Sequence, residues 1–525
     1  MKSIMTPQEI FNKVSKPKIQ RSTFDRSHGY KTTFDAGKLI PFYCDEALPG
    51  DTFKMSTSVF GRLATPIKPI MDNVMIDIHF FSVPLRLVWD NFQKFMGEQV
   101  DPGDSIDYLM PTMTPDDHTG GVYPEASNFD YLGIPTKVGG FEHRADFLRA
   151  MHLIWNEWYR DENLQDSLVV DKGDGPDSPD DYSALLTRGK RKDYFTGALP
   201  FAQKGDPVTI PFGTSAPITG LAVAGVPSTG PLTGILETDG TGTTSYANYW
   251  GVQYAEEDPN NTGFPNIRAD LSEASAQTIN LFREAASIQK LLERDARGGT
   301  RYTEIIYSHF GVQSLDSRLQ RPEYLGGGTS NLNVSSIAQT SESGGASTPQ
   351  GNLAAMGVFS DVKNGFIKSF TEHEIIIGFM SARADLNYQQ GLNKMWSRST
   401  RYDHYFPEFA HLGEQSVLNK EIYTQGTTAD EDVFGYQERF AEYRYKPSMV
   451  TGLFRSNAAT SLDVWHLSQD FASLPALNDS FIQENPPIDR VIAVPSEPQF
   501  IVDMYLDLKC TRPMPVVSIP GIDTF

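Results

Sequence analysis

The clearest helical pattern in the chain lies within residues 270–298. Asp270 and Glu273 have the spacing of a capping box, and a basic residue followed by two glycines at 297–299 is typical of a helix end. Apolar residues between these ends recur at steps of three and four, which predicts one buried face. We interpret this face as core packing, with a groove for a partner helix as the alternative. The face contains Leu281, Phe282, Ala285, Ile288 and Leu292.

The segment after this helix predicts a strand and then a polar loop. Residues 302–310 form a short, aromatic, strand-like run. Residues 316–328 place arginines, a glutamate and a tyrosine around Pro322 and end in three glycines. Because proline fixes the backbone and glycine frees it, we interpret the glycine run 326–328 as a flexible joint in a loop.

Alternation of apolar and polar side chains predicts half-buried strands at several other places. Their ranges are 52–63, 73–83, 366–384 and 499–510. His79 has no second histidine or carboxylate beside it at metal-ligand spacing, so we expect a residue of the strand face and not a ligand. A helical pattern covers residues 144–161, with Phe147, Met151, Ile154, Trp155 and Trp158 on one side.

Composition favours a β-rich fold. The 525 residues include 34 prolines, 43 glycines and 11% aromatic side chains, while long helical patterns are few. We expect neither a signal peptide nor a membrane helix, because no apolar run approaches the roughly twenty residues that a membrane helix needs. The two cysteines, Cys44 and Cys510, are too few for a disulfide framework, and they exclude a cysteine-based metal site.

The net charge of −21 is unevenly distributed. Residues 1–38 hold eight Lys or Arg against three Asp or Glu, so this segment is +5 and the remainder is −26. Cations interleaved with rings can pair with phosphates and stack on bases, so we expect a basic N-terminal arm that binds nucleic acid. A solvated tail that binds nothing is an equal alternative. The candidate residues are Lys13, Lys16, Lys18, Arg21, Phe24, Arg26, Tyr30 and Lys31.

An acidic region at residues 98–181 holds nineteen acids against five bases. Within it, four aspartates recur at every third residue in a loop with glycine and proline. Four clustered carboxylates could hold calcium, but they lack the EF-hand spacing, so we prefer a solvated loop and keep calcium as the weaker alternative. The aspartates are Asp171, Asp174, Asp177 and Asp180.

Other segments have the composition of insertions into a single domain of residues 39–525. Residues 205–267 contain no Lys or Arg and are dominated by Thr, Gly, Ser and Pro. Residues 329–351 are rich in Ser, Thr and Gly, which predicts an exposed loop. The acidic, partly helical residues 98–190 are the third predicted insertion.

Catalytic motifs are missing from the sequence. The ten histidines show no metal-binding spacing, and neither a Gly-x-Ser-x-Gly elbow nor a Walker loop occurs. We therefore expect a protein that is not an enzyme and has no cofactor.

Blocks of sequence with unusual aromatic and charged patterns occur along the chain from residue 22 to residue 525. They include Ile154-Trp-Asn-Glu-Trp-Tyr-Arg-Asp-Glu-Asn-Leu-Gln165, Ser317-Arg-Leu-Gln-Arg-Pro-Glu-Tyr-Leu-Gly-Gly-Gly328 and Phe434-Gly-Tyr-Gln-Glu-Arg-Phe-Ala-Glu-Tyr-Arg-Tyr-Lys446. In content and order these blocks resemble the major capsid protein of gokushoviruses, small single-stranded-DNA bacteriophages of the microvirus family. Gly197, Phe201 and Ala202 depart from the commonest residues of that family.

The resemblance implies an eight-stranded antiparallel viral jelly-roll barrel with long insertion loops and a few helices. The first and last strands of such a barrel are neighbours, so residues 52–63 should pair with residues 499–510. A T=1 icosahedral capsid around circular single-stranded DNA, assembled in the host bacterial cytoplasm, is the implied function. The implied partners are other copies of the chain, the DNA genome, an internal scaffolding protein, a small basic DNA-binding protein, a pilot protein and a host surface receptor.

The resemblance also implies contact surfaces. An inter-subunit loop would contain Arg318, Arg321, Glu323 and Tyr324. Residues 205–267 would form a protrusion at the three-fold axis, with host contact or inert decoration as alternative roles. Its apolar residues should meet their counterparts across the axis. These residues are Leu221, Val223, Val226, Leu232, Ile235 and Leu236.

A rival interpretation comes from another class of protein. Jelly rolls also host lectins and hydrolases, so a carbohydrate-binding or carbohydrate-cleaving protein is the alternative function.

Overall fold

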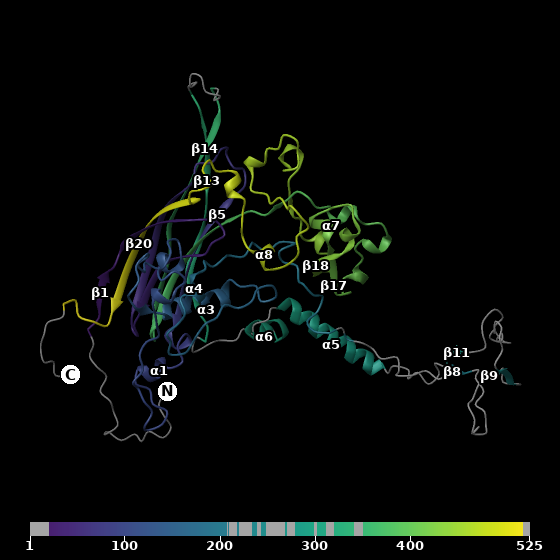
Figure 1. Cartoon of the computed structure of the whole chain (residues 1–525), viewed down its shortest axis with the longest axis horizontal. Coiled ribbons are helices and arrows are strands. Elements are labelled where there is room, and N and C mark those ends of the chain that lie inside the picture. The colour runs from purple at the N-terminus through teal and green to yellow at the C-terminus, as the bar shows by residue number, and fades with distance from the viewer. Residues whose placement is uncertain are drawn as a thin grey trace. The chain divides into compact units, whose positions relative to one another are not determined.

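The computed structural model describes residues 20–206, 208, 218–219, 234–238, 243–247, 268–269, 279–298, 302–310, 320–340 and 350–517. The chain divides into two units, one made of residues 1–202 and 314–525 and the other of residues 203–313. The first unit is mainly β and is drawn with its labelled strands in Figure 1.

A six-stranded antiparallel sheet forms one layer of the first unit. Its order is β1 (Ser22–Asp25), β20 (Phe500–Arg512), β4 (Thr52–Leu63), β14 (Leu353–Ser369) and β13 (Asn333–Ala338), and β2 (His28–Phe34) also pairs with β20. The register places Phe500 opposite Leu63 and Cys510 opposite Phe53. The predicted pairing of the strands at 52–63 and 499–510 is therefore confirmed.

A four-stranded antiparallel sheet forms the second layer. Its order is β12 (Glu323–Asn331), β5 (Val74–Pro84), β15 (Glu374–Ala384) and β3 (Ile40–Ala47). The predicted strand at 366–384 is two strands, because residues 370–373 separate β14 from β15. The paired strands of the described residues thus form two main sheets and not one closed barrel.

One apolar core lies between the two sheets. Along β20, side chains alternate strictly between buried and exposed from Phe500 to Cys510, as the sequence predicts. The buried side chains of β4 and β20 join those of β5 and β15 in a single cluster. Representative members are Phe53, Val59, Ile76, Phe80, Phe366, Met380, Met504 and Leu506. This two-layer arrangement agrees with the predicted jelly-roll architecture.

A second core covers the other face of the four-stranded sheet. Helix α3 (Asp146–Trp158) packs Met151 and Ile154 into a cluster with Phe81 and Ile377. Because β15 is buried on both faces, its sequence is continuously apolar at residues 375–380 apart from one glycine. Helix α3 confirms the helical pattern predicted at 144–161.

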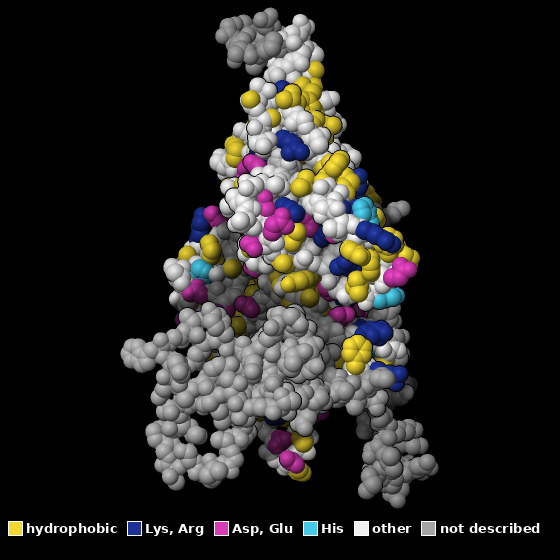
Figure 2. All heavy atoms as spheres, turned by 90° about the vertical axis from the view of Figure 1, so that its right-hand side faces the viewer, with side chains coloured by type: hydrophobic (Ala, Val, Ile, Leu, Met, Phe, Trp, Pro, Cys, Tyr) yellow, Lys and Arg dark blue, Asp and Glu magenta, His cyan; other side chains and the backbone are white. Residues whose placement is uncertain are grey.

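The remaining elements of the first unit are short. They are α1 (Phe92–Phe95), α2 (Asn128–Tyr131), α4 (Asp180–Ser183), α7 (Asn419–Ile422), α8 (Asp479–Ile482), β6 (Thr112–Met113), β7 (His143–Arg144), β16 (Asn387–Tyr388), β17 (Glu414–Leu418), β18 (Val433–Glu438) and β19 (Ser448–Met449). The segment that carries α7, β17 and β18 lies at the right of Figure 1 and faces the viewer in Figure 2. On that face, hydrophobic side chains lie among acidic and basic side chains.

The second unit contains α5 (Ile279–Gly298) and α6 (Tyr302–Phe310). Two short ladders join β8 (Ile218–Thr219) to β11 (Arg268–Ala269) and β9 (Gly234–Thr238) to β10 (Thr243–Ala247). In the parts of the chain that the structure describes, no helix combines the length and apolar character needed to cross a bilayer.

Three predictions about this part of the chain need correction or stay open. Residues 302–310 form helix α6 and not a strand, because a short apolar run fits a buried helix as well as a strand. In α5, Phe282 is 59% exposed and Ile288 44% exposed, so the expectation of a fully buried stripe is wrong for these residues. The capping pair Asp270 and Glu273 lies outside the described residues.

The basic arm and the Ser/Thr/Gly-rich loop also contain regular structure. Residues 22–34 belong to β1 and β2 of the six-stranded sheet, so only the residues before them remain as a candidate arm. Residues 329–351, predicted as an exposed loop, include the end of β12 and all of β13. Strand β13 is exposed along most of its length, which explains its polar, low-complexity sequence.

The glycine run 326–328 lies inside strand β12 and is not a flexible joint. A Cβ on Gly326 would contact the backbone oxygen of Gly365 in β14, and one on Gly365 would contact the backbone of Met55. Glycine is therefore needed at 326 because backbones of the two sheets approach closely there, and at 365 because β14 and β4 approach closely within one sheet. This correction removes the loop predicted at 323–328.

A similar fit occurs in the core, where Gly61 of β4 lies opposite Phe359 of β14. A Cβ on Gly61 would overlap with the ring of Phe359, which is 1% exposed. The missing side chain of Gly61 leaves the space that the ring fills.

We predict that Gly61→Ala lowers the free energy of unfolding by about 1–3 kcal/mol, because the extra methyl overpacks the core. Denaturant unfolding of the purified subunit measures the change. Ser58→Ala, on the exposed face of the same strand, should change it by less than about 0.5 kcal/mol. Adding Phe359→Leu should recover part of the loss in Gly61→Ala, and equal losses with and without Phe359→Leu would refute the contact.

Candidate nucleic-acid interface

Five of the eight predicted DNA-binding residues lie in the part of the chain that the structure describes. Lys13, Lys16 and Lys18 lie outside the described residues. Phe24 is in β1 opposite Cys510. The other four candidates, Arg21, Arg26, Tyr30 and Lys31, contact neighbouring parts of the first unit.

Those four residues already have partners within the fold. Arg26 forms an ion pair with Asp45 at 2.6 Å, and Lys31 forms one with Asp503 at 2.6 Å. Arg21 donates to the carbonyl of Gly50 and to the Thr52 hydroxyl. The Tyr30 hydroxyl donates to the carbonyl of Tyr131 at 3.1 Å. DNA binding by Lys13, Lys16 and Lys18 stays a prediction.

The structure reveals a further basic site that the sequence alone did not predict. A cavity of about 520 Å³ lies beside the C-terminal end of α3. It is lined by five cationic residues, Arg160, Arg188, Lys190, Lys192 and Arg383, and by two acidic residues, Asp161 and Glu162. We call this cavity the basic pocket.

The inner wall of the basic pocket is a buried charge cluster. Arg188 and Arg383 share one carboxylate, Asp77, at 3.1 Å and 2.6 Å. Burial would raise the pKa of Asp77, but the two guanidinium groups lower it below its usual value. Burial, assisted by Arg188, lowers the pKa of His79 to about 4, so this imidazole is neutral at pH 7. Its Nδ1 lies 2.8 Å from the Tyr159 hydroxyl, which agrees with a residue of the strand face.

Lys190 and Glu484 extend this cluster. The Lys190 ammonium donates to Gln469 Oε1 at 2.9 Å and to the carbonyl of Phe481 at 2.6 Å, and burial lowers its pKa to about 8. Glu484 accepts from the Ala384 N–H at 3.1 Å, and burial raises its pKa to about 7. Lys190 is therefore held mainly by neutral acceptors, which leaves the pocket with a positive bias.

Aromatic side chains complete the walls. Tyr324 contacts the rings of Phe81 and Trp158 at centroid distances of 5.5 Å and 6.0 Å. Trp158 and Tyr324 are 44% and 41% exposed, so part of each ring is accessible. A pocket with cations and accessible rings is suited to an anionic group carried on a flat ring, as in a nucleotide. The sequence signal was the run 188–192, which holds four cations in five residues.

The residues predicted for an inter-subunit loop fall on strand β12 and the segment before it. Glu323 forms an ion pair with Lys368, and Tyr324 forms the wall of the basic pocket described above. Arg321 is exposed just before β12, and Arg318 lies outside the described residues.

The predicted calcium aspartates do not converge. Asp174 accepts from Trp89 Nε1 at 2.7 Å, Asp177 pairs with the buried Arg149, and Asp180 accepts from the Thr119 N–H at 2.9 Å. Asp171 accepts from the Gly173 N–H at 2.8 Å. Over the described ranges, no group of three or more His, Cys, Asp or Glu is arranged to hold a metal ion.

The predicted apolar residues of the protrusion lie mostly outside the described residues, namely Leu221, Val223, Val226 and Leu232. Ile235 and Leu236 are in β9 and pair with Tyr246 and Ser245 of β10.

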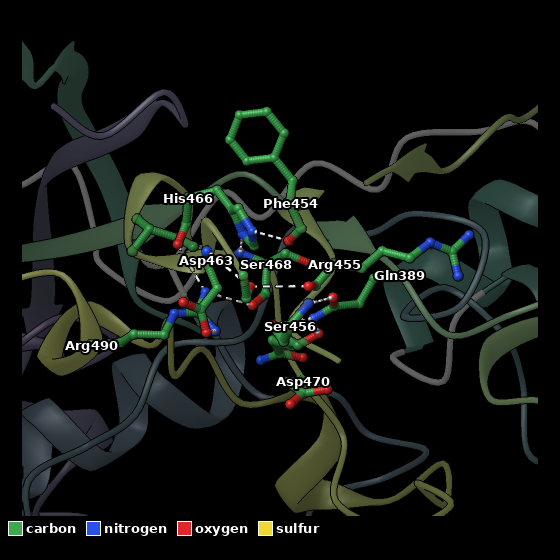
Figure 3. A network of polar contacts seen from close by, with 12 residues as sticks. Gln389, Phe454, Arg455, Ser456, Asp463, His466, Ser468, Asp470 and Arg490 are labelled. Carbon is green, nitrogen blue, oxygen red and sulfur yellow. Dashed lines mark hydrogen bonds and ion pairs between the residues drawn. The ribbon is translucent and has the colours of Figure 1, made fainter. Parts of the chain in front are cut away.

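A polar network fixes the long connection before β20 (Figure 3). His466 is 4% exposed; its Nε2 lies 2.6 Å from the Phe454 carbonyl, and its Nδ1 accepts from the Ser468 N–H at 3.1 Å. Arg490 donates to the carbonyls of His466 and Ser468 at 2.8 Å and 3.0 Å. These contacts satisfy buried backbone groups, so His466 has a structural role.

Two sheets around a shared core, extended by long loops with many exposed side chains, define a mainly β structural protein of the jelly-roll type. The comparisons agree with this class. The family model described as "Capsid protein (F protein)" matches residues 12–522, so the chain belongs to this capsid family.

Three relatives cover almost the whole chain. "Capsid protein VP1" of Bdellovibrio phage phiMH2K is 49% identical over 98% of both chains. "Capsid protein VP1" of Chlamydia phage 1 is 46% identical, covering 98% of this chain and 97% of the relative. "Capsid protein VP1" of Spiroplasma virus 4 is 36% identical over 96% of both chains.

The resemblance to gokushovirus capsid proteins is thereby confirmed. The chain has a major structural role in a virion capsid, where copies of it assemble into a shell, and it is not an enzyme. This finding favours the capsid function over the carbohydrate-binding or carbohydrate-cleaving alternative.

The raised pKa of Glu484 gives a prediction about pH. Between pH 4.5 and about 7 the unfolded chain has lost this proton while the folded chain keeps it. The free energy of unfolding should therefore fall as the pH rises through this window, by up to about 3 kcal/mol. Glu484→Gln keeps an acceptor for Ala384 and should remove this part of the pH dependence.

Urea unfolding of dissociated subunits at several pH values measures the effect. Glu497→Gln, at an exposed position, is the matched control, and its free energy of unfolding should depend on pH as in the wild type. If Glu484→Gln left the pH dependence of the free energy of unfolding unchanged, the Glu484 carboxyl would not titrate between pH 4.5 and about 7.

Proposed function

We propose that the chain forms a T=1 icosahedral shell around a circular single-stranded DNA genome, assembled in the host bacterial cytoplasm. The observation that carries this proposal is the match to phage capsid proteins over nearly the whole chain. A single-stranded genome is flexible, so a shell subunit can hold it through cations and rings without reading its sequence.

Electron microscopy of the expressed protein tests the proposal. Closed shells or pentamers support it, whereas a monomer that retains or digests a polysaccharide would support the carbohydrate alternative. In the proposal, the partners beyond other copies and the genome are an internal scaffolding protein, a small basic DNA-binding protein, a pilot protein and a host surface receptor.

The proposed DNA contacts lie at the N-terminus. Lys13, Lys16 and Lys18 supply the clustered cations that phosphate contact needs, and Arg21 adjoins them at the edge of the sheet. The positive bias of the basic pocket supports a second contact with a phosphate or a base. Both contacts would be independent of base sequence.

We predict that replacing Lys13, Lys16 and Lys18 together by alanine weakens binding of single-stranded DNA. The slope of log affinity against log salt should become shallower by roughly 0.7 for each phosphate that the variant no longer neutralises. Titration of a labelled oligonucleotide at several salt concentrations measures the slope. Lys31→Ala is the control, because Lys31 is paired with Asp503. Equal slopes for the triple variant and the wild type would refute a DNA-binding arm.

Residues 205–267 are proposed as a protrusion at the three-fold axis. The segment contains no cation, and Thr, Gly and Pro favour turns and short strands over a core. Its apolar residues would meet their counterparts from two other copies, so that three weak loops make one stable tip. Contact with a host receptor is the proposed role, and stabilisation of the trimer alone is the alternative.

Replacing residues 214–263 by a short Gly-Ser turn tests this assignment. We expect the two sheets of the first unit to fold normally, because they are built from other residues. Particles should lose their three-fold protrusions and their adsorption to cells. Loss of protrusions with normal adsorption would favour the stabilising role, and failure of the sheets to fold would contradict the assignment as an insertion.

A further inference from the structure

Exposed aromatic side chains gather in residues 392–455. Trp396 is 72% exposed, Tyr402 68%, and Tyr405, Tyr443 and Tyr445 each 50–53%. Monomeric proteins rarely expose a contiguous apolar surface of this kind without a partner. The exposed aromatic residues of this segment therefore need an explanation.

Ring contacts show that part of this set forms one surface. Tyr405 contacts Phe440 at 5.3 Å and Tyr443 at 6.5 Å, measured between ring centroids. The Arg398 guanidinium lies 4.1 Å from the Tyr443 ring, and Arg439 lies 5.0 Å from the Phe440 ring. Nearby along the chain, Tyr402 contacts Phe409, and Arg401 lies over Phe406. We call residues 396–409 and 439–446 the aromatic–arginine patch.

Among the charges of this patch, all of which the structure describes, three cations and two acids form no ion pair. Arg398 and Arg444 are paired with Glu442 and Glu438. Among the residues that the structure describes, Arg401, Arg439 and Lys446 form no ion pair, and neither do two acids of the patch, Glu408 and Asp403. Tyr, Trp and Arg are the residues that contribute most to the energy of protein interfaces. The composition therefore fits a protein partner that presents acidic and apolar groups.

The same chain presents such a segment at residues 96–109. Residues 98–109 contain four acids and no Lys or Arg. Three apolar side chains are exposed among them: Leu109 is 84% exposed, Val100 79% and Ile106 46%. Asp101 and Asp107 are exposed as well, whereas Asp104 caps the turn by accepting from the N–H groups of Val100 and Asp101. We call this segment the acidic loop.

We propose that the aromatic–arginine patch of one copy binds the acidic loop of a neighbouring copy in the shell. The acidic loop follows α1, whereas the patch lies in the part of the first unit that carries α7, β17 and β18; Figure 1 shows these two parts on different sides of that unit. Such a contact is heterologous, because the patch of one copy meets a different surface, the acidic loop, on the next copy. Repetition of this contact around a symmetry axis closes a ring of copies. The proposal rests on the shell-forming role that the family establishes.

DNA is the less suitable occupant of the patch. Glu408 and Asp403 lie in the described patch without an ion pair, and they would oppose the dense charge of a phosphate backbone more than the two exposed aspartates of the loop. Single-stranded DNA and an apolar, acidic loop can both gain from the rings and the unpaired cations, but the loop also has exposed apolar side chains of its own, Leu109 and Val100, that the contact would cover. The test separates the two.

Charge reversal on each side, followed by recombination, tests the contact. Asp101→Lys with Asp107→Lys changes the loop, and Arg401→Glu with Lys446→Glu changes the patch, all at exposed positions. Each pair alone should lower the yield of shells about tenfold or more, because two attractions become repulsions. All four substitutions together should restore most of the yield. The shells are measured by sedimentation and electron microscopy.

Two controls keep the result interpretable. Glu497→Lys, an exposed charge change elsewhere in the first unit, should leave assembly unchanged. Leu109→Ser should lower the yield of shells without changing the unfolding midpoint of the subunit, because this side chain is already exposed. Normal shells from either reversed pair, or failure of the fourfold variant to recover, would overturn the proposal. Normal shells that lack DNA in the patch variant would assign the patch to nucleic acid instead. If even the wild type formed no shells, the proposed T=1 assembly would fail first.

Discussion

Close packing of two antiparallel sheets against each other is the constraint on which the rest of the structure depends. Each buried aromatic or aliphatic side chain in the shared core contributes about 1.5–3 kcal/mol by leaving water. That gain requires an accurate fit, and glycines provide it at two places. Gly61 leaves space for the Phe359 ring, and Gly326 lets β12 approach the backbone of β14. The loops that carry the charged surfaces are positioned by this rigid core.

Buried charge is the second constraint. It is concentrated on the face of the four-stranded sheet that points away from the shared core. Asp77 is shared by Arg188 and Arg383, Lys190 donates to neutral groups, and Glu484 is the other buried acid beside these cations. Burying unequal charge is costly unless hydrogen bonds or an added anion compensate it. The raised pKa of Glu484 and the lowered pKa of Lys190 are two signs of that cost. In our proposal, a bound phosphate adds to this compensation in the basic pocket.

Local periodicity predicted the central elements well and the contacts between distant segments poorly. Strands β4 and β20 follow the predicted ranges because each has one buried face that its own sequence records, and β5 and helix α3 follow theirs although they are more widely buried. The strand prediction for residues 302–310 was wrong because nine residues with several apolar side chains fit the helical period of 3.6 as well as the strand period of two. The basic pocket was missed because Arg160, residues 188–192 and Arg383 meet only in the folded chain. The glycines of β12 were misinterpreted for the same reason, since Gly365 lies far along the sequence.

A shell subunit must fold alone and still keep surfaces for its neighbours. The shared core is built from residues of the first unit alone, so one copy can bury these side chains without a neighbour. The apolar groups left outside it, such as Trp396 and Leu109, are accompanied by charges of opposite sign on the two surfaces. Charge adds little affinity to an exposed contact, but it selects the correct partner and speeds encounter. Weak, selective contacts repeated over many copies suit a closed shell, because a wrongly placed subunit can dissociate before the shell closes.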